Sequence, residues 1–214
     1  MKEHLLPSIR LYLVLTLVLG FGYPAVVWAV GRLAFRDAAA GSPLPKGDTI
    51  VGSSLIGQSF VMPGHFHGRP SAAGTGYDAT ASSGTNLGPT SQKLADAVKD
   101  AVKSVRDDEG VAGSVPADAV TSSGSGLDPH ISPEYARLQI PRVSRETRIP
   151  AAALEALVAR NTEGRFLGVY GESRVNVLAL NLEIDTRLGH PQIAPTPTPT
   201  PPPAASAAPA PGTP

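Results

Sequence analysis

The chain has 214 residues, with 22 prolines, 22 glycines and no cysteine. Without cysteine, neither a disulfide-stapled secreted mini-protein nor a thiolate zinc site is possible. The 18 basic and 18 acidic side chains give a formal net charge of zero, and no run of five lysines or arginines offsets this balance. Nucleic acid is therefore not an expected partner.

An uncharged, apolar stretch covers residues 11–31. As a helix it would be about 31 Å long, which matches a hydrocarbon core of about 30 Å. We therefore expect a retained transmembrane helix, preceded by a short N-terminus of residues 1–10. The alternative is a signal peptide cleaved near the alanines at 38–40, but the apolar core of such peptides is usually only about 7 to 15 residues long. Basic residues flank the stretch on both sides. The positive-inside rule, by which the more basic flank stays in the cytoplasm, therefore leaves its orientation open.

Residues 37–190 are expected to form one α+β domain. Apolar residues recur with helical spacing in 90–109 and 150–162, and each stretch predicts a helix. A third helix is predicted to start at residues 132–134 and to kink or end early at Pro141.

Strands are harder to place. Three short apolar stretches bounded by glycine predict strands at 49–51, 55–60 and 166–170. The alternation of apolar residues in 175–184 favours a further strand, although Asn176 could instead cap a helix there.

Two segments predict irregular structure. Residues 74–90 are rich in Gly, Ser, Thr and Asn, which is typical of a long loop. Residues 195–214 hold nine prolines and no charge. Because proline lacks a backbone donor and fixes φ, we expect a disordered, solvated tail that acts as a spacer.

Sequence motifs for ATP chemistry are missing. The chain has neither a Gly-x-x-x-x-Gly-Lys-Ser/Thr sequence nor the Asp-Lys-Thr-Gly-Thr sequence that carries the phosphoaspartate of P-type pumps. Any ATP hydrolysis must therefore take place on another chain, and we do not expect this chain to be an enzyme on its own.

Two alternative functions deserve comparison. Ser125, Asp128 and His130 suggest a membrane-anchored extracytoplasmic hydrolase, but no Gly-x-Ser-x-Gly elbow is present and residues so close in sequence rarely form a triad. The Asp-Pro dipeptide at 128 is more typical of a turn. His65, His67 and His130 suggest a metal-binding protein, since imidazole suits Zn, Cu or Ni, but their spacing follows no known pattern.

Three arginines lie three residues apart at 142, 145 and 148. On a helix that continues past Pro141 they would form one ridge. Such a ridge is either a solvated face or a docking surface for an acidic partner.

Six segments strongly resemble, in order, the motifs of one family. They are GSSLIGQSF at 52–60, FHGRPSA at 66–72, SGTNLGPTS at 83–91, SGSGLDPHISP at 123–133, QIPRV at 139–143 and RVNVL at 174–178. The family is the C subunit of the Kdp potassium-transporting P-type ATPase (KdpC). The resemblance runs from the apolar stretch to about Leu188 and leaves only the Pro-rich tail outside. In one departure, His65 stands where the family usually has tyrosine.

The resemblance implies an accessory, non-catalytic subunit of the cell membrane, with a cytoplasmic N-terminus and an extracytoplasmic domain. Its implied partners are a channel-like potassium-binding subunit, an ATP-hydrolysing P-type subunit, a small single-span subunit and membrane lipid. The family is described as a catalytic chaperone that raises the pump's affinity for ATP. Because only about ten residues would lie on the cytoplasmic side, we favour a structural or entrance-gating role, with ATP involved only through the complex and potassium handled by the partner.

The matching segments also mark candidate residues for contacts with partners or nucleotide. They are Gln58, Arg69, Ser83, Asn86, Ser125, Asp128, His130, Gln139, Arg142 and Asn176. Amides and hydroxyls of this kind can bond to a partner's loops without burying charge. No catalytic residue, metal ligand or tightly bound cofactor is expected.

Overall fold

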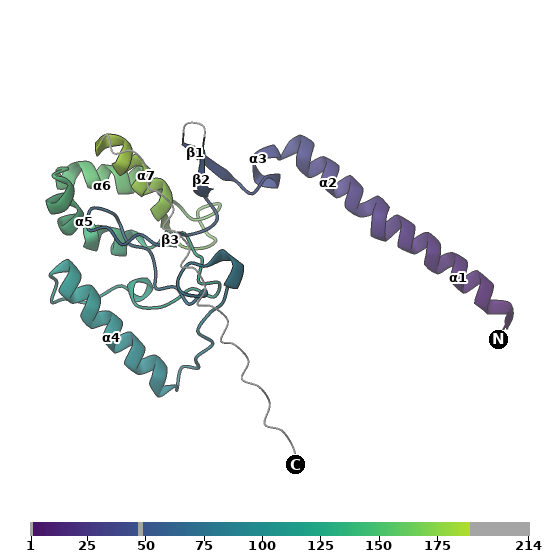
Figure 1. Ribbon diagram of the computed structural model, residues 1–214, viewed down its shortest axis with the longest axis horizontal. Helices are drawn as coiled ribbons and strands as arrows, with labels where there is room; N and C mark the ends of the chain where they lie inside the picture. The colour runs from purple at the N-terminus through teal and green to yellow at the C-terminus, as the bar shows by residue number, and fades with distance from the viewer. Residues whose placement is uncertain (1, 47–48, 189–214) are drawn as a thin grey trace, which may run out of the picture. The chain divides into compact units, whose positions relative to one another are not determined.

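The computed structural model describes residues 2–46 and 49–188 (Figure 1). The chain divides between Leu55 and Ile56 into two compact units, which are described separately below. The Pro-rich tail predicted at 195–214 lies outside the described residues.

The first unit begins with one long helix. It consists of α1 (Lys2–Leu17), a π-helical turn η1 (Val18–Gly22) and α2 (Tyr23–Ala34). Within His4–Ala34, the most apolar 18-residue window has a mean hydropathy of 2.1, and none of that window is buried. An N-terminal helix long and apolar enough to cross a membrane is thus present, and it extends beyond the predicted 11–31 at both ends.

A short hairpin completes the first unit. After α3 (Arg36–Ala39), the strands β1 (Pro43–Lys46) and β2 (Thr49–Ser53) pair antiparallel. The strand predicted at 49–51 lies within β2.

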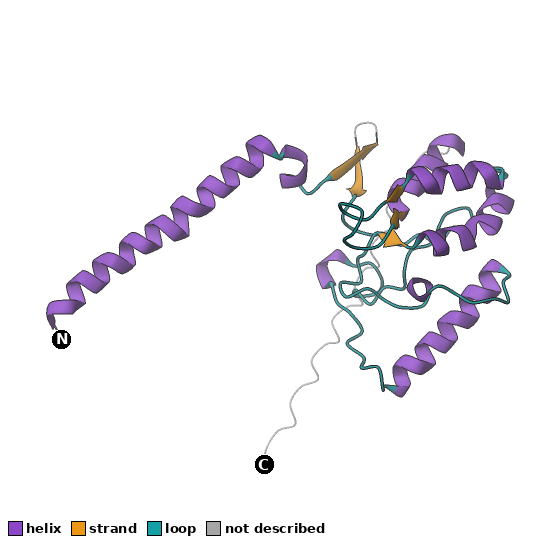
Figure 2. Ribbon diagram, turned by 180° about the vertical axis from the view of Figure 1, so that it is seen from behind, coloured by secondary structure: helices purple, strands orange, loops and turns teal. Residues whose placement is uncertain are grey.

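The second unit contains a small antiparallel sheet, drawn in orange with the hairpin in Figure 2. Its strands are β3 (His130–Ile131), β4 (Thr162–Glu163) and β5 (Arg174–Asn176), in the order β3-β5-β4. Together with the helices around it, this sheet makes the unit an α+β domain, as predicted.

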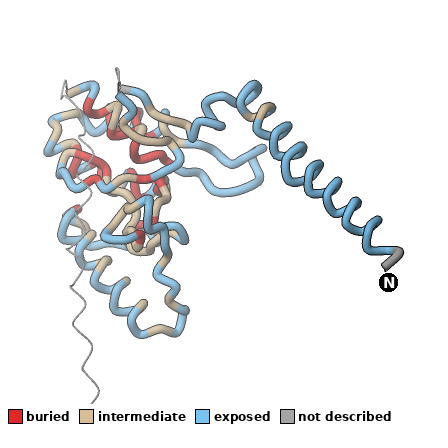
Figure 3. The backbone as a smooth tube through the Cα atoms, turned by 45° about the vertical axis from the view of Figure 1, so that its right-hand side comes forward, coloured by how far each residue is buried: buried red, intermediate tan, exposed pale blue. Residues whose placement is uncertain are grey.

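Four helices and two 3-10 turns complete the second unit. They are η2 (Ala79–Ala81), α4 (Gln92–Glu109), η3 (Ala117–Ala119), α5 (Pro133–Thr147), α6 (Ala151–Arg160) and α7 (Val177–Leu188). The helix predicted at 150–162 is α6, and the predicted inner residues Leu154, Leu157 and Val158 are at most 2% exposed. They pack into a core to which α5, α7 and β5 also contribute, and Figure 3 colours the buried residues red.

The helix predicted at 90–109 is α4, and Gly110 ends it with φ +68° in the left-handed region that glycine adopts easily. Its apolar face is only half-buried, and Glu109 is its one buried residue. The loop predicted at 74–90 is also confirmed, with η2 as its only regular element.

Pro141 does not end α5, which continues to Thr147. Proline removes the hydrogen bond that the carbonyl of Arg137 would receive. Both residues are exposed, so water can solvate the freed carbonyl and the helix tolerates the proline.

Three strand predictions are wrong. In 55–60, the Gly57 N–H donates to the Leu127 carbonyl (2.8 Å), so the segment follows a neighbouring loop instead of a strand ladder. In 166–170, positive φ angles at Leu167 (52°) and Gly168 (74°) reverse the chain, which leaves a single bridge between Phe166 and Tyr170.

The strand predicted at 175–184 also fails, because β5 ends at Asn176 and α7 follows directly. The Asn176 Oδ1 accepts a hydrogen bond from the Ala179 N–H at 3.0 Å. Asn176 is therefore a helix cap, which was the alternative reading of this segment.

Candidate functional site

Backbone pairing joins several of the motif segments in the second unit. The Ser83 N–H donates to the Ser125 carbonyl (3.0 Å), and His130 pairs with Asn176 between β3 and β5. Each bond joins two motifs that lie far apart in the sequence. Motif segments in loops are thus connected to each other and to the strands β3 and β5.

Two glycines allow these loops to approach closely. A Cβ on Gly57 would lie 2.7 Å from the Tyr77 ring, and one on Gly126 would lie 2.6 Å from the Ala73 nitrogen. Both distances are shorter than real Cβ contacts, and Gly126 also has φ +69°. Gly57 and Gly126 are therefore explained by packing within the chain.

Arg69, Asp128 and His130 form a half-buried charged cluster. Arg69 Nη1 lies 3.2 Å from Asp128 Oδ2, and His130 Nδ1 lies 3.2 Å from Asp128 Oδ1. Burial alone would raise the pKa of Asp128, but hydrogen bonds from His130 and the nearby Arg69 charge outweigh it and lower this pKa. Asp128 is therefore a stable carboxylate that joins its own motif to the FHGRPSA motif through Arg69.

Two surface cavities lie beside this cluster, and Arg69 lines both. One, of about 510 Å³, includes Asp128, His130 and Ser132 in its wall. The other, of about 570 Å³, includes Tyr77. The Tyr77 hydroxyl donates to the Arg69 carbonyl (2.7 Å), and burial followed by the Asp128 charge raises its pKa to about 12. Tyr77 therefore remains a neutral donor.

A second polar cluster lies deeper, on the inner face of α5. Arg142 is 4% exposed, and its Nε donates to Glu109 Oε1 at 2.9 Å. Its Nη1 donates to the carbonyls of Pro63 and His65, and its Nη2 donates to Gln139 Oε1 at 2.7 Å. This one guanidinium therefore joins α4, α5 and the loop before the FHGRPSA motif.

Gln139 is fully buried, and its side chain bonds to both the N–H and the carbonyl of His67. Its Oε1 accepts from the His67 N–H at 2.7 Å, and its Nε2 donates to the His67 carbonyl at 3.0 Å. The His67 Nε2 is buried, and no group in residues 2–46 or 49–188 forms a hydrogen bond with it. Burial, followed by the Arg142 charge, lowers the pKa of His67. Burial raises the pKa of Glu109, although Arg142 opposes the shift.

Helix α7 contributes two buried polar residues that sequence reasoning missed. The Asn181 side chain accepts from the Phe66 N–H (2.8 Å) and donates to the Phe66 carbonyl (2.9 Å). Asp185 Oδ1 lies 2.8 Å from His65 Nε2. A signal for both was present, since residues 181 and 185 fall on the same helical face as Leu178.

The remaining candidate residues lie nearer the surface. Ser83, Asn86 and Ser125 are exposed on adjoining loops, and Asn86 has φ +52°. Gln58 is half-buried beside Gly57. Of the ten candidates, three are thus buried, four are half-buried, and only Ser83, Asn86 and Ser125 are exposed.

The geometry does not support a hydrolase. The Ser125 Oγ accepts from the Leu127 N–H (3.1 Å) and lies 3.5 Å from the Ser123 Oγ, whereas His130 pairs with Asp128. In residues 56–188, no hydrogen bond joins Ser125 to His130. The nucleophile and the base are thus not coupled, as acyl transfer requires.

The histidines are also used separately. His65 pairs with Asp185, His130 pairs with Asp128, and His67 is held through its backbone by Gln139. Within the part of the chain that the structure describes, no group of three His, Asp or Glu residues could hold a metal ion.

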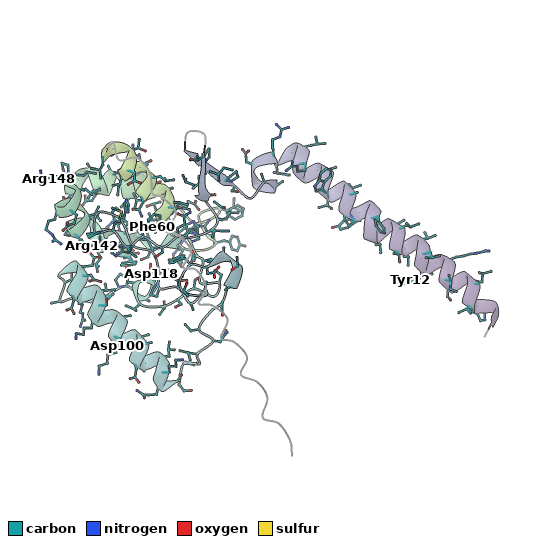
Figure 4. All side chains as sticks on the ribbon, viewed as in Figure 1. Tyr12, Phe60, Asp100, Asp118, Arg142 and Arg148 are labelled. Carbon is teal, nitrogen blue, oxygen red and sulfur yellow. The ribbon has the colours of Figure 1, made fainter. Side chains whose placement is uncertain are left out.

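The predicted ridge of arginines is wrong. Arg142 is buried among the polar groups of the domain, whereas the Arg145 side chain is 64% exposed and pairs with Glu146. Arg148 lies past the end of α5, with φ +62°, and Figure 4 shows it at the periphery. The helix ends before a third arginine can join the row.

Comparisons with known proteins agree with the motifs. The family model described as "K+-transporting ATPase, c chain" (KdpC) matches residues 5–186. A KdpC subunit of a potassium-transporting ATPase from Gemmatimonas aurantiaca is 50% identical over 187 residues, covering 87% of this chain and 94% of the relative. Those from Koribacter versatilis and Mycobacterium tuberculosis H37Rv are 47% and 48% identical, each covering 86% of this chain and 95% and 99% of the relative. The chain belongs to the KdpC family.

Proposed function

We propose that this chain is the accessory C subunit of an ATP-driven potassium uptake pump. The match to the family model over residues 5–186, which contains all six motif segments, carries the proposal. The three relatives above bear the name of that subunit.

In the proposed arrangement, the N-terminal helix anchors the chain in the cell membrane with residues 1–10 in the cytoplasm. The domain of residues 37–190 lies outside, and 195–214 form a spacer. The exposed, apolar helix supports the anchor. The partners are a potassium-binding channel-like subunit, an ATP-hydrolysing subunit, a small single-span subunit and surrounding lipid.

The proposed role is assembly and stabilisation of the complex, without chemistry on this chain. Three observations support it: Ser125 is not coupled to His130, Asp128 is paired with Arg69, and Glu109 is paired with Arg142. Potassium and ATP are then bound by partner subunits, and any effect on ATP affinity acts through the complex. The exposed hydroxyls and amide of Ser83, Asn86 and Ser125 are candidate contacts with a partner.

Potassium-stimulated ATPase activity tests the proposal. Membranes that contain the partner subunits should show this activity with the chain and lose most of it without the chain. Tagged chain extracted in mild detergent should also recover the two large subunits. Equal activity in both membranes, together with recovery of the chain as a lone monomer, would overturn the proposal.

The orientation has its own test, because the chain has no cysteine. A single cysteine introduced as Ser104→Cys, at an exposed position of α4, should react with a membrane-impermeant maleimide on intact cells. Ser8→Cys, exposed before the predicted span, is the matched control and should react only after the cells are opened. The reverse pattern would place the domain in the cytoplasm.

A further inference from the structure

An ordered but fully exposed segment stands out in the second unit. Every residue from 163 to 174 is exposed. The segment is nevertheless structured, because β4 pairs with β5 at its base and Phe166 bridges to Tyr170 near its tip. Within residues 56–188, nothing covers these side chains.

The tip of this segment, residues 166–170, is called the apolar turn here. Its four large side chains are exposed as follows: Phe166 73%, Leu167 77%, Val169 72% and Tyr170 67%. An exposed cluster of this kind marks an interaction surface, whereas single exposed apolar residues need no explanation. The turn also holds Leu167 at φ +52°, a conformation that is unfavourable for leucine. The turn therefore presents apolar side chains on a fixed backbone.

Two ion pairs surround the base of the turn. Arg165 Nη2 lies 2.8 Å from Glu172 Oε2, and Arg174 Nη2 lies 2.7 Å from Glu163 Oε2. All four side chains are about half exposed or more. Apolar, aromatic-rich centres inside a polar rim are typical of protein–protein interfaces, where such centres supply most of the binding energy.

The charge balance distinguishes a protein partner from a lipid surface. Segments that bind an anionic bilayer usually combine apolar residues with surplus lysine or arginine. Here each arginine at the rim is matched by a glutamate, and residues 166–173 contain no basic residue. A neutral rim fits a protein pocket better than it fits an anionic membrane.

We propose that the apolar turn docks into an apolar pocket on another subunit of the pump complex, with Phe166 and Tyr170 as its anchors. This inference rests on the proposed function, because it requires the complex to form. The inference goes beyond the proposed function because it names the surface through which this chain binds another subunit.

Co-purification with charged variants tests the inference. The double variant Phe166→Asp with Tyr170→Asp should reduce recovery of the large subunits at least tenfold. Met62→Asp, at a residue 62% exposed in the same unit, is the matched control and should recover them as the wild type does. Far-ultraviolet circular dichroism of each purified variant should match that of the wild type, since the changed side chains are exposed and the backbone should keep its fold.

The outcomes separate the two proposals. If the wild type recovers the large subunits and the double variant recovers them equally well, the apolar turn is not the docking surface, while the proposed function stands. If the wild type recovers neither subunit, the proposed function fails, and this inference fails with it.

A photo-crosslink identifies the occupant directly. Tyr170→p-benzoylphenylalanine in the full chain, irradiated in membranes with the partner subunits present, should give an adduct that mass spectrometry assigns to one of those subunits. An adduct with lipid alone, or no adduct above that of the same substitution at Met62, would overturn the inference.

Discussion

The inner face of α5 and the apolar turn reverse the usual division between interior and surface. Gln139 and Arg142 are among the most buried residues of the domain, whereas Phe166 and Tyr170 are among the most exposed. The buried polar groups are extensively bonded to other motifs of the same chain. The exposed apolar side chains of Phe166 and Tyr170 contact little of their own domain. A buried polar residue in this domain therefore indicates a structural role, and an exposed apolar one indicates a partner.

The largest expected effect comes from removing the buried guanidinium. Arg142→Ala leaves the Glu109 carboxylate and two backbone carbonyls without their donor, and breaking a buried ion pair in this way costs about 3–5 kcal/mol. Urea unfolding of the full chain in detergent micelles, followed by near-ultraviolet circular dichroism, measures this loss.

Arg145→Ala is the matched control for this experiment. Arg145 lies one turn further along α5, and its pair with Glu146 is exposed, so the loss should be below about 1 kcal/mol. Equal losses for the two arginines would contradict the contrast between the buried face and the surface.

A smaller effect is expected at Asn181. Asn181→Leu removes both hydrogen bonds to the backbone of Phe66, which is 0% exposed and has no access to water. Leaving such groups unsatisfied costs about 1–3 kcal/mol each. Because the leucine adds buried apolar surface that offsets part of this cost, the same urea titration should show a loss in the lower part of the summed range, about 2–4 kcal/mol. An unchanged midpoint would mean that these bonds contribute little.

His67 should make the stability of the domain depend on pH. Because burial lowers its folded-state pKa below 6.5, the folded state resists protonation there. The contribution of His67 to stability is therefore complete above about pH 6.5 and is lost as the pH falls toward the folded pKa. Between pH 7.5 and 5.5 the wild type should lose more stability than His67→Gln. Parallel curves for the two proteins would exclude this residue as a source of the dependence.

The smallest effect on stability is expected at the apolar turn. Phe166→Ser and Tyr170→Ser remove side chains that are 73% and 67% exposed, so the free energy of unfolding should change by no more than about 0.5 kcal/mol. If either variant lowers stability as much as Asn181→Leu does, the turn packs against its own domain, and the contrast with the inner face of α5 disappears.

Sequence periodicity correctly predicted the amphipathic helices. In α4 and α6, apolar residues on one side alternate with polar residues on the other, so the helical repeat is visible. The same reasoning missed α7, because Asn181 and Asp185 are buried together with Leu178 and Ile184. Counting these two as part of the buried face gives the helical repeat, whereas treating them as surface residues leaves an alternation that resembles a strand.

The motifs predicted which residues belong to the candidate site, but not what each residue does there. The six segments identified the residues that meet in space, yet their spacing could not distinguish Arg142, which is buried, from Ser125, which is exposed. That difference depends on contacts between distant segments, such as the bond from Arg142 to Glu109. The apolar turn was missed for a similar reason: its apolar side chains suggested a strand, whereas the positive φ angles at Leu167 and Gly168 reverse the chain there.

The π-helical turn at Val18–Gly22 changes which side chains of the long N-terminal helix face the same way. A π turn accommodates one additional residue, which rotates the helix beyond it by about 100° relative to an uninterrupted α-helix. Residues of α1 and α2 that a single helical wheel would align therefore point in different directions. A neighbouring helix that follows one stripe along α1 meets a different set of side chains along α2, so scanning mutagenesis of this anchor should be interpreted with a separate wheel for each half.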